Sequence, residues 1–326
     1  MTQMVASSGG QGTSAQVLRF REWASKYAIW LTLVMLIVAA QIVSRGVFLE
    51  SQNVLNIVAQ NSVAGTLAVG QTLVILTAGI DLSLGSITAL ASMVVLLMQA
   101  QGSTVARLAG LGVALGCGLI NGLLVTKGRV PPFVATLGMM QVALGLAYVV
   151  SNGYPVYEGD HMSMLFGADK VGPVPLIVAL WVFVVVIAWV ITRRTNVGAY
   201  IFATGGNERA ARVSGIRTDR TKLFVYVFAG FCAGVAAIIW INRLGYSEPN
   251  IGASLTLGSI APVFVGGTSP FGGVGGVGNT VGGVLIMGIL INLMVLVGIN
   301  VNIQQTVEGL IILAVVYMFI RQQRSR

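Results

Sequence analysis

The feature that most constrains the fold of this chain is a succession of uncharged apolar runs, each about as long as a lipid bilayer is thick. A helix needs about 20 such residues to cross the hydrocarbon core of a membrane. Only 9% of the 326 residues are charged, against about 25% in soluble domains. The sequence therefore predicts an all-α polytopic membrane protein. Ten spans are expected, at residues 27–44, 53–78, 82–99, 108–126, 133–150, 173–192, 223–242, 255–265, 280–297 and 303–320.

The Lys and Arg residues predict the orientation of these spans. Fifteen of the 19 fall on the same side as the N-terminus and four on the other side. Cytoplasmic loops carry the excess of positive charge in membrane proteins, so both termini are expected in the cytoplasm. The predicted domains are a cytoplasmic tail at 1–26, a transmembrane domain at 27–320 and a second cytoplasmic tail at 321–326.

Glycine is frequent, at 42 residues, and small residues let helix backbones approach closely in lipid. Three pairs of glycines spaced four residues apart are expected at helix contacts: Gly112 with Gly116, Gly118 with Gly122, and Gly230 with Gly234. The two cysteines, Cys117 and Cys232, lie in apolar runs and are expected to be free.

Two glycine-containing breaks indicate an internal duplication. One follows the second span at residues 78–81, and the other follows the eighth span at 266–278. If spans 2–5 correspond to spans 7–10, the offset of five crossings makes the repeat inverted, as in many transporters.

One long polar stretch, residues 193–222, interrupts the apolar runs and contains seven basic and two acidic residues. In its middle, residues 207–215 predict one short helix. Asn207 can cap its first turn, Glu208 lies where the helix dipole favours an anion, and Gly215 can end it. An ordinary cytoplasmic loop on lipid headgroups explains the charge but not the capped helix, so we favour a helix that docks in a groove of a soluble partner.

The predicted docking residues share this one short helix. Ala210, Ala211 and Val213 are expected to form a small apolar face, and Arg209 and Arg212 another face. The complete set is Asn207, Glu208, Arg209, Ala210, Ala211, Arg212, Val213, Ser214 and Gly215.

Asp81 lies between two apolar runs, where an unpaired carboxylate costs about 2.5 to 3.5 kcal/mol on insertion scales. It must therefore lie at an interface, find partners or line a cavity. Asp81 and Ser83 can cap the start of the third span, and a structural cap is the favoured reading. A role in gating or substrate passage is the alternative. Glu308 poses the same question in the tenth span: it pairs with a basic residue or lies near the outer surface.

Amide side chains line the second span, which should therefore face protein or water rather than lipid. Asn56, Gln60 and Asn61 suit a hydroxyl-rich cargo in a wet pathway, and they suit interhelical hydrogen bonds equally well. The candidates for the translocation pathway or its gate are Asn56, Gln60, Asn61, Asp81, Ser83 and Phe133.

No enzyme site is apparent. The chain has no Gly-rich phosphate loop followed by Lys and Ser or Thr, and no metal-ligand spacing around its one histidine, His161. We therefore expect no catalytic residue, no metal and no cofactor on this chain. The basic residues are spaced between apolar runs, which is not typical of a nucleic-acid-binding surface.

Four blocks of sequence resemble one known family. They are AGIDLSLGS at 78–86; PFVATLG at 132–138 with GLA at 145–147; GGNERAARVSGI at 205–216; and GGTSPFGG at 266–273 with GLIIL at 309–313. The chain resembles the permease subunits of bacterial ATP-binding-cassette importers for monosaccharides, the ribose, xylose, arabinose and galactose group. It departs from the family pattern at Leu144, Val274 and Glu308, where a basic residue is frequent.

The resemblance implies an assembly in the bacterial inner membrane. A second permease, identical or paralogous, would form the pathway with this chain, and a periplasmic sugar-binding protein would dock outside on loops that include residues 151–172. Two ATPase subunits would carry ATP and Mg²⁺ and would receive the helix at 207–215 as a coupling helix. The resemblance leaves the sugar open. The rival hypothesis is a gradient-driven secondary transporter of a small polar solute that uses Asp81 and Glu308 as ion sites, and a membrane enzyme is a third, weaker option.

Overall fold

The structure is a computed structural model that describes residues 29–157, 170–171 and 174–324. The predicted tail at 1–26, most of the outer loop at 151–172, and His161 lie outside the described residues. The described chain is almost wholly helical, as expected for an all-α membrane protein.

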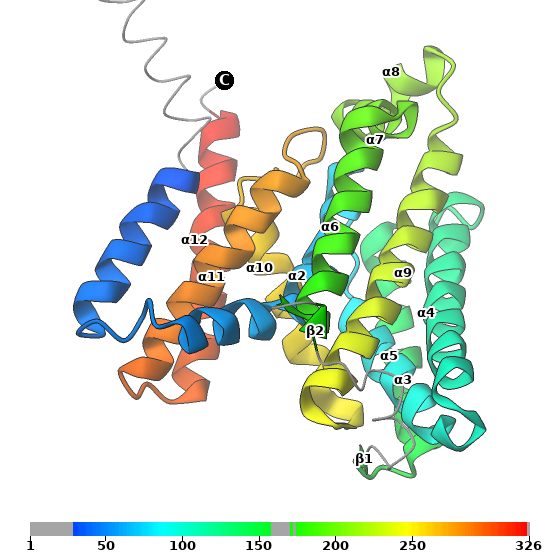
Figure 1. The fold of residues 1–326 in the computed structure, drawn as a ribbon. Coiled ribbons are helices and arrows are strands. Elements are labelled where there is room, and N and C mark those ends of the chain that lie inside the picture. The colour runs from blue at the N-terminus through cyan, green and yellow to red at the C-terminus, as the bar shows by residue number, and fades with distance from the viewer. Residues whose placement is uncertain (1–28, 158–169, 172–173, 325–326) are drawn as a thin grey trace, which may run out of the picture.

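The helices follow the predicted spans in order (Figure 1). A first helix at Ile29–Val43 precedes α2 Ser51–Leu76, α3 Leu84–Leu97, α4 Ser103–Thr126, α5 Pro132–Ser151, α6 Leu176–Arg194, α7 Asn196–Gly206, α8 Glu208–Val213, α9 Thr218–Leu244, α10 Gly252–Val265, α11 Val277–Leu296 and α12 Val301–Arg324. Two 3-10 turns, η1 Gln99–Gln101 and η2 Pro249–Ile251, precede α4 and α10. Two antiparallel pairs of short strands join β1 Val156–Tyr157 to β4 Tyr246–Ser247, and β2 Lys170–Val171 to β3 Val174–Pro175.

Six of the described helices are long and apolar enough to cross a membrane: α4, α5, α6, α9, α11 and α12. Three shorter apolar helices lie at Ile29–Val43, Leu84–Leu97 and Pro249–Val265. The remaining predicted span coincides with α2, whose amide side chains lower its hydropathy. The class of an all-α polytopic membrane protein is therefore confirmed, while the count of ten crossings and the inverted repeat stay predictions.

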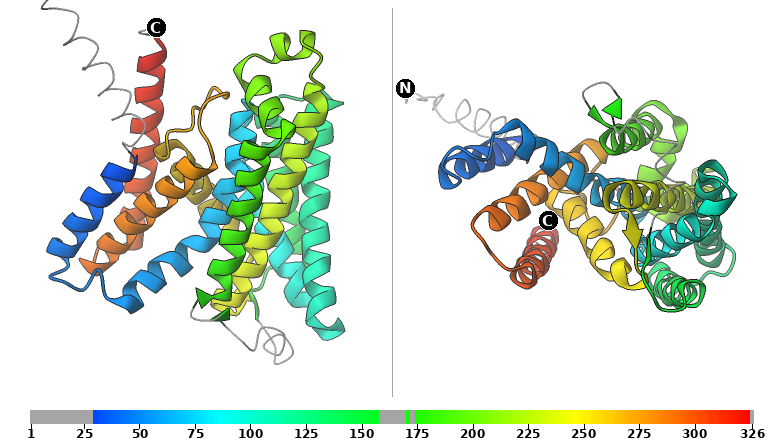
Figure 2. Two further views of the ribbon diagram at one scale, coloured as in Figure 1. Left: turned by 45° about the horizontal axis from the view of Figure 1, so that its top comes forward. Right: turned by 60° about the horizontal axis from the view of Figure 1, so that its bottom comes forward.

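Two groups of helices lie on either side of α2 and α10. The first helix, α11 and α12 form one group, and α4, α5, α6 and α9 form the other, as Figures 1 and 2 show. The main buried core lies among α2, α3 and α9. Both cysteines are buried and free, as predicted.

The glycine pairs of α4 and α9 let these two helices touch backbone to backbone. A Cβ on Gly118 would lie 3.0 Å from the Cα of Gly230, and a Cβ on Gly230 would lie 2.5 Å from the carbonyl oxygen of Ala114. The prediction of close contact is confirmed for the pairs that begin at Gly118 and Gly230. For Gly112 and Gly116 it stays a prediction, since an added Cβ there meets nothing within 4 Å in the part of the chain that the structure describes.

The break between α2 and α3 is buried and fixed by polar contacts from neighbouring helices. The Asn121 side chain of α4 donates to Ser83 Oγ at 2.8 Å and to Asp81 Oδ2 at 3.4 Å. Thr136 of α5 donates to the carbonyl oxygen of Ile80 at 3.1 Å. In the amide orientation that matches donors with acceptors, Gln71 of α2 pairs with both main-chain groups of Asp81. The polar residues of this break therefore hold a fixed turn between two helices.

The capping prediction for Asp81 and Ser83 needs correction. Ser83 occupies the N-cap of α3, but its backbone is helical, with φ −89° and ψ −12°, and its side chain caps no helical N–H. It donates instead to Asp81 Oδ1 at 2.5 Å, and the same oxygen accepts the N–H of Ser83 at 2.8 Å. Asp81 thus stabilises the turn that precedes the helix rather than the helix itself.

Candidate functional site

The polar stretch at 193–222 contains two helices, where the sequence predicted one. α7 precedes α8, and the Thr195 side chain caps α7 by accepting the N–H of Gly198. Gly205 and Gly206 are the last two residues of α7. Gly205 is required there by a close approach, because a Cβ on it would lie 1.8 Å from the carbonyl oxygen of Leu76.

The ends of α8 are those that the sequence predicted. The Asn207 side chain accepts the N–H of Ala210 at 2.9 Å, and Glu208 lies in the first turn. Beyond the last turn, Gly215 takes a positive φ of 86° and the N–H of Ile216 bonds to the carbonyl oxygen of Ala211 at 3.0 Å. A helix of six residues is too short to be stable alone, so its neighbours must hold it.

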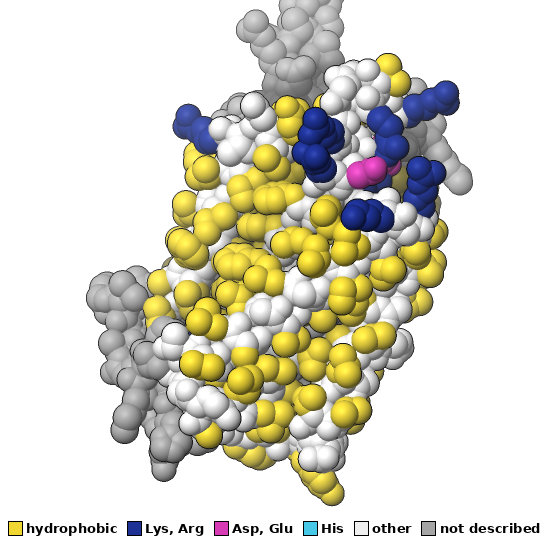
Figure 3. Space-filling model, turned by 90° about the vertical axis from the view of Figure 1, so that its right-hand side faces the viewer, with side chains coloured by type: hydrophobic (Ala, Val, Ile, Leu, Met, Phe, Trp, Pro, Cys, Tyr) yellow, Lys and Arg dark blue, Asp and Glu magenta, His cyan; other side chains and the backbone are white. Residues whose placement is uncertain are grey.

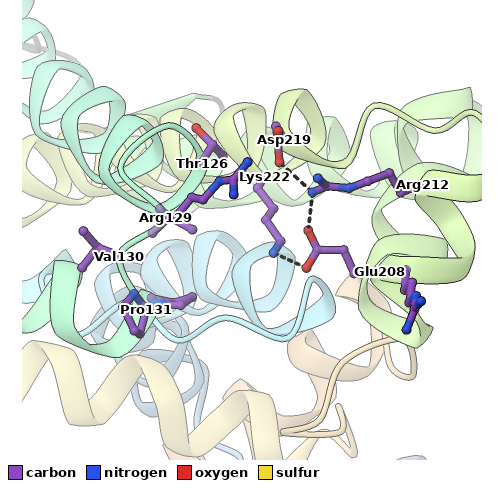
Figure 4. A pocket seen from close by; sticks show the side chains of 11 residues that line it. Thr126, Arg129, Val130, Pro131, Glu208, Arg212, Asp219 and Lys222 are labelled. Carbon is purple, nitrogen blue, oxygen red and sulfur yellow. Dashed lines mark hydrogen bonds and ion pairs between the residues drawn. The ribbon is translucent and has the colours of Figure 1, made fainter.

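Ion pairs attach α8 to the start of α9 (Figure 4). Glu208 binds Lys222 at 2.6 Å and Arg212 at 3.3 Å. Arg212 in turn binds Asp219 at 3.1 Å and the Thr218 hydroxyl at 3.0 Å. The guanidinium of Arg212 is thus used in contacts within this chain, whereas Arg209 forms no ion pair within the described residues.

The charge state of Glu208 follows from this network. Partial burial alone would raise the pKa of Glu208, but the hydrogen bond and charge of Lys222 and the charge of Arg212 outweigh it and lower the pKa. A carboxyl group whose pKa is lowered on folding stabilises the fold at neutral pH. That contribution is lost as the pH falls through the lowered pKa.

Replacing Glu208 by Gln should loosen α8 without unfolding the chain. Each exposed ion pair is worth about 0.2 to 1 kcal/mol, so losing two predicts about two- to 30-fold faster amide hydrogen exchange at residues 208–216. Exchange measured by mass spectrometry at neutral pH checks this. Asp219→Asn removes only one pair and should have a smaller effect, and identical exchange in wild type and Glu208→Gln would contradict the role of the network.

The apolar residues of α8 do not share one face, contrary to the prediction. Ala211 is buried against the chain, at 5% exposure, while Val213 is 86% exposed and Ala210 is also exposed. The cause is the ion pairs, which turn the Glu208 and Arg212 side of α8 toward α9. The outward surface, here called the α8 tip, therefore combines Arg209, Ala210 and Val213.

A cavity of about 610 Å³ separates α8 from the turn between α4 and α5. Figure 4 shows Arg129 and Pro131 on the side of the cavity opposite Glu208 and Arg212. Basic side chains gather at this end of the molecule, and Figure 3 shows a largely hydrophobic flank below them. This pattern is typical of a membrane protein with its basic end in the cytoplasm.

The predicted pathway residues are not brought together at one place. Asn56 and Gln60 are exposed on α2, and Phe133 is exposed at the start of α5. Asn61 is buried, and its side chain donates to the Ile57 carbonyl oxygen at 2.7 Å. Asp81 and Ser83 are fully buried in the α2–α3 break.

Of the two readings of the second span, interhelical hydrogen bonding is observed at one amide residue. Asn53 of α2 exchanges hydrogen bonds with Asn292 of α11, at 3.2 and 2.9 Å. The exposed Asn56 and Gln60 make no such interhelical bond within the described residues. Interhelical bonding is therefore shown for Asn53, and a wet pathway stays a prediction for the other two.

Sequence reasoning missed a second cavity, of about 490 Å³, at the other end of the bundle. It joins Trp240 near the end of α9, Ser254 at the start of α10, and Gln305 and Glu308 of α12. The sequence showed no sign of this cavity, because its lining comes from three elements that are far apart in sequence and share no spacing pattern. An uncharged segment of 59 residues precedes Glu308.

Comparison with known proteins gives a consistent result. The ribose import permease protein RbsC of Escherichia coli strain K12 is 39% identical over 312 residues, which cover 93% of this chain and 96% of that protein. The D-allose transport system permease protein AlsC of the same strain is 34% identical, with 94% and 95% covered. The fructose import permease protein FrcC of Rhizobium meliloti is 32% identical, with 88% and 82% covered. No solved structure matches the chain.

A family model described as the permease component of the branched-chain amino acid transport system matches residues 53–316, from the start of α2 almost to the end of α12. That match includes the α2–α3 break, α8 and both cavities. The chain therefore belongs to this family of transport permease components.

Proposed function

We propose that the chain is a transmembrane permease subunit of an ATP-binding-cassette importer that carries a monosaccharide into the cell. The observation that carries this proposal is the α8 tip. One side of the capped helix α8 is held to α9 by ion pairs, and its other side exposes an apolar and basic surface. Relatives that import ribose, allose and fructose support the sugar as cargo.

In this proposal the chain crosses the bacterial inner membrane ten times, with both termini in the cytoplasm. The C-terminal end of α12 lies at the same end of the bundle as α8 (Figure 1), which supports a shared cytoplasmic side. Strand β1, which pairs with β4, lies at the opposite end, which would face the periplasm. The spans would be surrounded by membrane lipid.

The chain would work with three kinds of partner. Two ATPase subunits would bind ATP and Mg²⁺ in the cytoplasm, and the chain itself would bind neither. A second permease would complete the pathway, and a periplasmic sugar-binding protein would deliver the cargo to the outer end. Among these contacts, the coupling site at residues 207–215 would receive the motion of the ATPase.

The contacts of α8 support a mechanism for this coupling. ATP-driven closure of the two ATPases would displace the α8 tip, and the ion pairs of Glu208 and Arg212 would pass the displacement to α9. Gly205, at the end of α7, contacts Leu76 at the end of α2 and Gly273 in the loop after α10. The permease would then alternate between outward-open and inward-open states.

Reconstitution in liposomes tests the proposal against a gradient-driven transporter. The complete assembly should import labelled sugar only when ATP is supplied, because the energy comes from the ATPase. The chain alone, given a proton or sodium gradient, should import none. Gradient-driven uptake by the chain alone would instead favour the rival hypothesis.

A further inference from the structure

The cavity at the end of the bundle opposite α8 has the size and position of a cargo site. Its volume of about 490 Å³ falls within the range of about 300 to 1,000 Å³ typical of small-molecule sites. It lies between the end of α9 with β4, the start of α10 and the first turns of α12. In the proposed topology this is the outer half of the permease, where cargo enters.

The residues that line the cavity suit a sugar. The indole of Trp240 is fixed because its Nε1 donates to the Tyr246 carbonyl oxygen at 3.1 Å, and a fixed aromatic ring offers a flat apolar surface to the C–H face of a sugar ring. Ser254 and Gln305 supply hydroxyl and amide groups, which both donate and accept hydrogen bonds.

Glu308 gives the cavity a carboxylate acceptor from α12. This carboxylate is half-buried in a helix long and apolar enough to span a membrane, and within the described residues it forms no ion pair or hydrogen bond. Gly258 of α10 lies next to it, and a Cβ there would be 3.7 Å from Glu308 Oε1. Ionisable groups inside spans commonly mark the path of a substrate.

The charges of the lining restrict the cargo. Glu248 and Glu308 are both acidic, and no Lys, Arg or His lines the cavity in the described chain. Two carboxylates repel an anion and accept hydrogen bonds from hydroxyl groups. A phosphorylated or acidic sugar is therefore disfavoured here.

We propose that this cavity is a subsite of the transport pathway that binds a neutral sugar or polyol. Trp240 would stack on the ring, and Glu308 with Gln305 would bind its hydroxyl groups. The proposal rests on the proposed function of the chain, and it adds the residues that select the cargo.

Uptake by the complete transporter in ATP-loaded liposomes tests the subsite. The probes are labelled ribose, allose and fructose, with ribose 5-phosphate as the anionic probe. Glu308→Gln and Trp240→Ala are each expected to lower uptake of the neutral sugar about tenfold or more, because a hydrogen bond to a charged group and an aromatic contact are lost. Both variants should still co-purify with the ATPase subunits, and Trp240→Phe, which keeps an aromatic ring, should recover most of the uptake.

The controls separate this proposal from the proposed function. Glu50→Gln changes an exposed carboxylate at the N-cap of α2, which does not line the cavity, and should leave uptake unaltered. Gln305→Ala, an exposed side chain, repeats the test with little risk to folding. Unchanged uptake in all the cavity variants, or import of the phosphorylated probe as fast as ribose, overturns the subsite. If the wild-type assembly imports none of the three neutral sugars with ATP, the proposed function fails instead.

Discussion

Replacing Gly205 by Ala is expected to abolish transport, whereas the same change at the next residue, Gly206, is expected to be tolerated. A Cβ on Gly205 would lie 1.8 Å from the carbonyl oxygen of Leu76 and 2.7 Å from the backbone nitrogen of Gly273. Both are main-chain atoms, so a change of side-chain rotamer cannot relieve the clash. A Cβ on Gly206 meets nothing within 4 Å among the described residues.

The size of the effect follows from the cost of separating these segments. Overpacking costs about 1 to 3 kcal/mol when side chains can adjust, and about 3 kcal/mol corresponds to more than a hundredfold in an equilibrium constant. ATP-driven uptake and the thermal unfolding temperature of the purified protein should both fall for Gly205→Ala. Equal behaviour of Gly205→Ala and Gly206→Ala would show that this contact is dispensable.

The same contact connects three distant parts of the chain. The N–H of Gly273, in the loop between α10 and α11, donates to the Leu76 carbonyl oxygen at 3.0 Å. A Cβ on Gly272 would lie 2.8 Å from the backbone nitrogen of Ala78. The two glycine-containing breaks that the sequence identified thus meet at the end of α7, immediately before α8.

The sequence predicted the helices well because their signals are local. An uncharged run of apolar residues specifies a span wherever it occurs, and Asn207 and Gly215 specify the ends of α8 through their own backbone neighbours. The breaks at 78–81 and 266–278 were recognised for the same reason.

What the sequence did not predict depends on contacts between distant segments. The need for glycine at position 205 could not be predicted, because a close approach to Leu76 leaves no local signature in the sequence. The outward position of Val213 depends on ion pairs that join α8 to Lys222 and Asp219 of α9. The outer cavity exists only where α9, α10 and α12 meet, so its residues carried no shared pattern.

The α8 tip is expected to decide whether the ATPase binds at all. Arg209→Glu reverses a charge that has no ion-pair partner within the described residues. Val213→Asp replaces a side chain that is 86% exposed with a carboxylate. Residues at the centre of a docking contact typically cost 2 kcal/mol or more when altered, which is about 30-fold in affinity. Each variant should therefore lose co-purification with the ATPase.

Arg212→Glu cannot separate a lost contact with the ATPase from a displaced helix. Arg212 forms ion pairs with Glu208 and with Asp219 of α9, so reversing its charge would also displace α8. Arg193→Glu is a better control, since it reverses an exposed charge at the end of α6, outside α8. Arg209→Glu and Val213→Asp should retain normal membrane insertion and an unchanged unfolding temperature. If the ATPase still binds both variants as tightly as it binds Arg193→Glu, α8 is not the coupling helix, and the cavity beside Arg129 becomes the next surface to test.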